Sequence, residues 1–123
     1  MKVTPKRKRS DSTKAKAEAL RAAAAPLLPA PLGVTLRKQD MPFWQAITEA
    51  RPRETWTAID LTHAATLART LADMETLQAQ IDEAGYTFGD SVNPAFAVHE
   101  KLSRRAMSLS RMLHVHALAT VGR

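Results

Sequence analysis

One long helical stretch limits the folds open to this chain more than any other feature of the sequence. The segment WTAIDL begins at Trp56, and Thr57 stands three residues before Asp60, a pattern that resembles a capping box. Trp56 and Leu61 occupy the two positions of a hydrophobic staple, and Gly85 is suited to the left-handed position after a helix end. The sequence therefore predicts one helix of about 27 residues, roughly 40 Å long at 1.5 Å per residue, in a chain of 123 residues.

This predicted helix has two apolar faces. Larger side chains recur at steps of three and four residues: Ile59, His63, Thr66, Leu67, Thr70, Leu71, Met74, Leu77 and Ile81. Small side chains dominate the opposite face, at Leu61, Ala64, Ala65, Ala68, Ala72 and Ala79.

A 13.5 kDa chain offers little protein to cover both faces. We therefore predict that another copy of the chain packs on the small face, through Trp56, Leu61, Ala65, Ala68 and Ala72. The alternative is an exposed alanine-rich face that serves only helix propensity.

Two further helices are predicted around the long one. A shorter helix precedes it in DMPFWQAITEAR, with Asp40 as N-cap and Pro42 in the first turn, and Pro52 ends it. A third helix follows from Pro94 to about Leu113 and has a buried stripe of six residues, Ala95, Val98, Leu102, Ala106, Leu109 and Leu113. Its far side carries Lys101, Arg104, Arg105 and Arg111.

The connection between the two longer helices, GYTFGDSVN at 85–93, is either a two-residue β-hairpin at Gly89-Asp90 or an irregular loop. In either case it is short enough for the helices to pack as an antiparallel hairpin. The predicted fold class is all-α, a long antiparallel helical hairpin preceded by a shorter helix and by a flexible basic N-terminal segment.

The charge of the chain is concentrated at its beginning. The first 21 residues contain two acids and eight bases, which are Lys2, Lys6, Arg7, Lys8, Arg9, Lys14, Lys16 and Arg21. The other residues contain ten bases and ten acids, so the net charge of +6 belongs to this segment alone. These eight bases are the candidate DNA-binding residues, because clustered lysine and arginine gain affinity for phosphates by releasing counterions.

Two other interpretations of the basic segment remain open. In the first interpretation, the segment is only a solvated tail. In the second, it docks on an acidic protein or a membrane surface. No aromatic residue is interleaved with the charges, which argues against stacking on single strands.

The predicted organisation has four parts. Residues 1–25 form a basic, partly helical or disordered DNA-contacting segment, and 26–40 form a proline-rich linker. Residues 41–113 form the helical oligomerisation core, and 114–123 form a C-terminal tail.

Signs of catalytic chemistry are missing from the sequence. There is no cysteine, no phosphate-binding glycine loop and no nucleophile elbow. His114 and His116 form an H-x-H pair without a third ligand at a useful spacing, and His63 falls in the predicted core stripe. We expect no enzyme, no cofactor and no metal site, and, without a long apolar run, a soluble protein with no membrane partner.

The region from about residue 40 to 116 resembles the small subunit of the DNA-packaging terminase of tailed bacteriophages. The resemblance lies in the PFWQAI segment, the long helix before Gly85, Asn93-Pro94, and RMLHV at 111–115. It departs where such chains continue with Leu-Gly-Leu-Thr-Pro, because His114 replaces that glycine and HALAT replaces the Thr-Pro segment. An N-terminal helix-turn-helix domain, present in some such subunits, has no room here.

The resemblance implies a helical subunit that assembles into a homo-oligomeric ring of about eight to eleven copies. It also implies double-stranded viral DNA and the large terminase subunit, with its ATPase and nuclease, as partners in the host cytoplasm. The remaining alternatives are a basic-tailed homo-oligomeric adaptor for proteins and a dimeric transcriptional regulator, although the sequence offers no compact helix-turn-helix for the latter.

Overall fold

The structure is a computed structural model that describes Thr13, Lys16 and residues 26–116. Its elements, in chain order, are η1 (Lys38–Asp40), α2 (Met41–Glu49), η2 (Arg53–Thr55), α3 (Ala58–Ala84), β1 (Thr87–Phe88), β2 (Ser91–Val92) and α4 (Pro94–Met112). Helices dominate the described residues, which confirms the prediction of a mostly helical protein. The all-α prediction omitted the small two-stranded sheet.

Helix α3 has the boundaries that its end signals predict. The Thr57 hydroxyl accepts a hydrogen bond from the backbone N–H of Asp60, at 3.1 Å. At the other end, Gly85 has φ 90° and ψ 168°, so it uses the freedom of glycine without adopting the predicted left-handed helical conformation. Its N–H still closes the last turn on the carbonyl of Ile81.

The connection after α3 is a β-hairpin, which settles the two alternatives for residues 85–93. Thr87 pairs with Val92 and Phe88 with Ser91, and Gly89 takes φ 61° in the turn. Asn93 then joins the hairpin to both helices. Its side-chain amide donates to the Gly85 carbonyl at 2.9 Å, and its Oδ1 caps α4 by accepting from the N–H of Ala95 at 3.0 Å.

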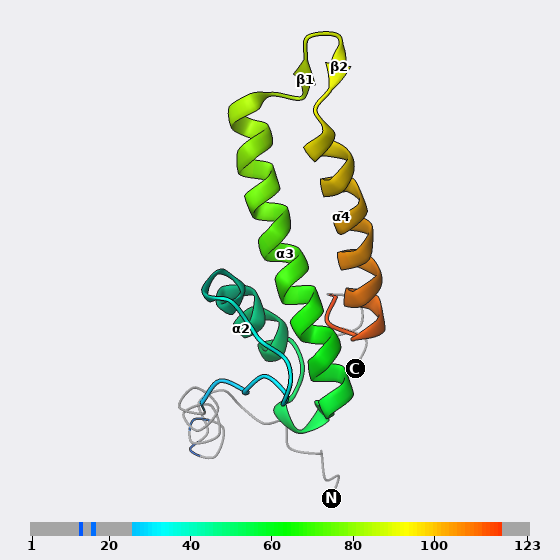
Figure 1. Ribbon diagram of the computed structural model, residues 1–123. Coiled ribbons are helices and arrows are strands. Elements are labelled where there is room, and N and C mark those ends of the chain that lie inside the picture. The colour runs from blue at the N-terminus through cyan, green and yellow to red at the C-terminus, as the bar shows by residue number, and fades with distance from the viewer. Residues whose placement is uncertain (1–12, 14–15, 17–25, 117–123) are drawn as a thin grey trace, which may run out of the picture.

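Helix α4 runs back alongside α3, and α2 lies beside the part of α3 nearer its N-terminus (Figure 1). That part of α3 is therefore covered from two sides. The core combines Trp44 and Ile47 of α2 with Leu67 of α3 and with Ala106 and Leu113 at α4 and its end. Trp44 is fully buried, and its indole N–H donates to the Leu28 carbonyl at 2.7 Å.

This packing corrects the predicted interface between copies. Ala65, Ala68 and Ala72 are at most 3% exposed and Trp56 is 9% exposed, while Leu61 is partly buried against the same cluster. The small face of α3 is thus covered by the chain's own α2 region, because alanines leave room for the Trp44 indole. With this packing Ala65, Ala68 and Ala72 present almost no surface to another copy, whereas Leu61 is only partly covered.

Only part of the stripe of larger side chains predicted on the opposite face of α3 is buried. Thr70 and Ile81 are buried as expected, but Ile59, His63 and Thr66 are exposed. On α4, Val98 is exposed as well. Helical periodicity extends an apolar stripe along the whole helix, whereas the neighbouring helices cover only some of its positions.

The proline-rich segment before α2 is more than a linker. It lacks regular structure up to Arg37, but Leu28, Val34 and Leu36 pack against the core. Asp40 also differs from its predicted role, because its side chain makes no helix cap. Instead its carboxylate accepts hydrogen bonds from the backbone N–H of Arg37 and from the Arg37 guanidinium, both at 2.8 Å.

The Arg37 guanidinium joins this segment to α3 by a second ion pair, with Asp73 at 2.8 Å. These hydrogen bonds with Asp40 and Asp73 raise the pKa of Arg37 above its usual value. Burial of Asp40 raises its pKa, but the hydrogen bonds and charge of Arg37 outweigh burial and leave the pKa below its ordinary value.

We expect the Asp40 pair to stabilise the fold above about pH 4 and to lose this effect as the pH falls through the lowered pKa of the native state. Asp40→Asn should therefore reduce stability at pH 6 and flatten its decrease between about pH 5 and pH 2. Urea unfolding across that range measures both effects. The control is Glu49→Gln on the exposed side of α2, and an equal pH profile for the two variants would exclude this role of Asp40.

Arg51 joins the three helices at one end of the molecule. Its guanidinium donates to the carbonyls of Thr55 at 2.7 Å and Leu113 at 2.9 Å, and pairs with Asp60 at 3.2 Å. It also lies over the ring of Trp56, 4.2 Å from the centroid. Its side chain is only 8% exposed, so it holds the end of α2, the start of α3 and the end of α4 in one buried site.

Arg51→Ala should lower the free energy of unfolding by about 2 kcal/mol, because it leaves two partly buried carbonyls and a partly exposed carboxylate without their donor. Arg69→Ala, on the exposed side of α3, is the matched control and should cost less than about 0.5 kcal/mol. Denaturant unfolding of both variants measures the difference. Similar losses in the two would mean that the Arg51 network does not stabilise the fold.

Helix α4 ends in a Schellman motif. The N–H of His114 donates to the Arg111 carbonyl and that of Val115 to the Ser110 carbonyl, both at 3.1 Å. His114 takes φ 57°, a left-handed conformation that glycine adopts more readily. The position where the sequence departs from its resemblance, histidine in place of glycine, is therefore one where the backbone favours glycine.

His114→Gly should stabilise the protein by about 0.5–1 kcal/mol, because the left-handed conformation no longer strains a Cβ atom. The side chain of His114 is exposed, so the substitution removes little packing. His114→Ala keeps the Cβ and serves as control, with no expected gain. Thermal and urea unfolding compare the variants, and equal stability of the two would disprove the strain.

Candidate nucleic-acid and assembly surfaces

The predicted DNA-contacting residues belong mostly to the part of the chain that the structure does not describe. Lys2, Lys6, Arg7, Lys8, Arg9, Lys14 and Arg21 lie outside the described residues. Lys16 is described, and its side chain is exposed. Their role in binding DNA remains a prediction.

The described body has a different electrostatic character. Residues 26–116 contain nine bases and ten acids, which gives a formal charge of −1. These charges are distributed unequally between the two long helices. Helix α3 has one base, Arg69, against five acids, which are Asp60, Asp73, Glu75, Asp82 and Glu83. Helix α4 has one acid, Glu100, against four bases, which are Lys101, Arg104, Arg105 and Arg111.

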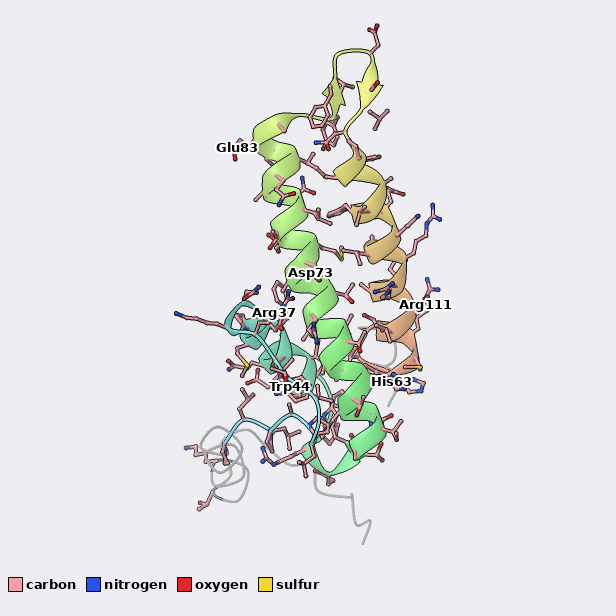
Figure 2. The ribbon with its side chains drawn as sticks, viewed as in Figure 1. Arg37, Trp44, His63, Asp73, Glu83 and Arg111 are labelled. Atoms are coloured by element: carbon pink, nitrogen blue, oxygen red, sulfur yellow. The ribbon has the colours of Figure 1, made fainter. Side chains whose placement is uncertain are left out.

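Two of the acids on α3 already have basic partners within the chain, since Asp60 pairs with Arg51 and Asp73 with Arg37. The other three, Glu75, Asp82 and Glu83, have exposed side chains beyond the region that α2 covers. In Figure 2, Glu83 lies on the side of α3 away from α4. On α4, Lys101 and Arg104 are exposed, whereas Arg111 borders a shallow groove between α3 and α4 together with Met74.

Exposed apolar side chains accompany the bases of α4. Val98, Met107 and Met112 are 47%, 54% and 50% exposed. A second apolar group lies at the β-hairpin, where Tyr86 and Phe96 pack edge to face with ring centroids 5.6 Å apart. The bases of α4 were identified from the sequence, but the excess of acids on α3 was not. Comparing the net charges of the two predicted helices would have revealed that excess.

The histidines do not form a metal centre in the described part of the chain. No group of three histidine, cysteine, aspartate or glutamate side chains there lies close enough to hold a metal ion. His63 was expected to be a core or interface histidine; it is exposed, so it is not in the core, and a place at an interface between copies stays a prediction. Among the same residues, no helix is both long and apolar enough to cross a membrane.

A comparison with protein-family models gives a match over residues 1–123 to the Hendrixvirinae small terminase family. The chain belongs to this family. The resemblance to the terminase small subunit of tailed phages is therefore confirmed, and it extends to the basic N-terminal segment and the C-terminal residues. No curated protein matches the chain. Family membership gives the chain the role of a terminase small subunit in phage DNA packaging.

Proposed function

We propose that this small terminase subunit binds double-stranded viral DNA at packaging initiation, as a homo-oligomeric ring, and regulates the large ATPase and nuclease subunit in the host cytoplasm. It contributes no catalytic residues of its own. The observation that carries the proposal is the family match over the whole chain, including the segment that contains the net positive charge.

The distribution of charge supports DNA binding through the N-terminal segment. Residues 1–21 carry eight bases and two acids, a formal charge of +6, while the described body carries −1. The body therefore adds no overall attraction for phosphates, and the N-terminal segment supplies it. Contacts of this kind position a protein on the duplex without reading its sequence.

Assembly strengthens the binding expected of such a segment. A ring of about eight to eleven copies presents the same segment many times, and linked weak contacts gain avidity. The described body suits a role as ring subunit, because its two packed helices carry exposed charged and apolar side chains. Regulation of the large subunit rests on family membership.

The test replaces four neighbouring bases in the variant K6A/R7A/K8A/R9A. We expect weaker duplex binding and a shallower salt dependence, by about 3–4 in the slope of log K against log salt for one engaged copy, because each lost phosphate contact removes about 0.9. Fluorescence anisotropy over a salt series measures the slope, and native mass spectrometry checks that oligomer size is unchanged.

The matched control is K38A/R69A, which removes two exposed bases of the body and should leave the slope unchanged. Unaltered DNA binding by the fourfold variant would show that the N-terminal bases do not contact DNA.

A further inference from the structure

We infer that neighbouring copies in the assembly meet through unlike sides of the helix pair, the acidic side of α3 in one copy against the basic side of α4 in the next. The acidic side consists of Glu75, Asp82 and Glu83, and the basic side is centred on Lys101 and Arg104. This inference rests on the proposed assembly and specifies its interface, which replaces the alanine face predicted from the sequence.

The first argument is the separation of charge within a nearly neutral body. Glu83 lies on the side of α3 away from α4 (Figure 2), and Lys101 and Arg104 are exposed on α4, the helix whose Ala106 is buried in the core. Arg104 has only a long contact with Glu100, 3.8 Å between Nη2 and Oε2, and both side chains are largely exposed. Both sides thus present charge that a complementary surface can neutralise.

The second argument is that the two charged sides lie at the same height along the helix pair. A shallow groove between α3 and α4 is lined by Met74 from one helix and Ser103 from the other. Glu75 directly follows Met74 and Arg104 directly follows Ser103, so the acid and the base stand at one level. A rotation about an axis parallel to the helices keeps that level, and therefore brings Arg104 of one copy to Glu75 of the next.

The third argument separates a protein occupant from DNA on the basic side. Met112 and Val98 are about half exposed among the bases of α4, and Met107, which is similarly exposed, borders the groove between α3 and α4. Such apolar side chains gain nothing from phosphates, whereas methionine and arginine are enriched where proteins meet. The basic side therefore fits a surface that offers both carboxylates and small apolar groups, which α3 provides at Glu75, Asp82 and Ala79.

Contact between unlike sides also determines the kind of assembly. When one patch binds a different patch on the next copy, each added copy exposes a fresh binding side, and a suitable rotation closes the series into a ring. Contact between like sides would stop at a dimer and would place acids against acids or bases against bases. The charges on this chain oppose that arrangement.

The experiment uses two charge-reversed full-length variants, E75K/E83K and K101E/R104E. Each has like charge on both sides, so each alone should assemble at least tenfold less than the unaltered chain at equal concentration. An equimolar mixture should assemble again, with the two variants in 1:1 ratio in closed rings of even copy number, because every contact in an alternating order joins opposite charges. Native mass spectrometry resolves the two masses in each oligomer.

The matched control is E54K/D90K, which reverses two exposed acids outside α3 and α4 and should assemble normally. Circular dichroism and thermal unfolding verify that each variant is folded. Recovery in the mixture itself excludes misfolding as the cause of the individual losses.

Three results would overturn the inference. If both variants keep the oligomer of the unaltered chain, the interface lies elsewhere, while the proposed assembly stands. If K101E/R104E keeps the oligomer but loses duplex binding, the α4 side contacts DNA. If the unaltered chain is itself monomeric, the proposed assembly fails together with this interface.

Discussion

The buried guanidinium of Arg51 is the contact on which the arrangement of helices depends. It binds the Thr55 and Leu113 carbonyls and the Asp60 carboxylate, and it stacks on Trp56. The end of α4 is far in sequence from the end of α2 and the start of α3, so this one side chain ties α4 to the connection between α2 and α3. A bidentate, planar cation suits this site because several acceptors converge there from different directions.

This arrangement leaves the far half of the helix pair free for other contacts. Trp44 and the alanines of α3 form a core at one end of the helix pair. At the other end, the Asn93 side chain donates a hydrogen bond to the Gly85 carbonyl and so joins the start of α4 to the end of α3. Between them, α3 exposes the acids Glu75, Asp82 and Glu83, and α4 exposes the bases Lys101 and Arg104. A small terminase subunit built this way keeps its body nearly neutral, and its positive charge belongs to a separate segment.

Local signals in the sequence predicted the helix boundaries well, because a cap depends on a few adjacent residues. Thr57 and Asn93 both cap the helices that they were expected to begin. Burial was harder to predict because it depends on contacts distant in sequence. The sequence alone does not show that Trp44 packs in the same core as the alanines of α3. Likewise, no local pattern indicates that Arg51 reaches the Leu113 carbonyl. For the candidate DNA site, composition indicated the basic residues of the first 21 positions, and their contact with DNA stays a prediction.

The central claim is that this subunit acts as a closed ring, and its mass in solution tests that claim most directly. Native mass spectrometry of the full chain, at moderate salt and without DNA, should show a single closed species of about eight to eleven copies. A monomer or a dimer as the only species would contradict the account, because neither multiplies the basic segment around the DNA.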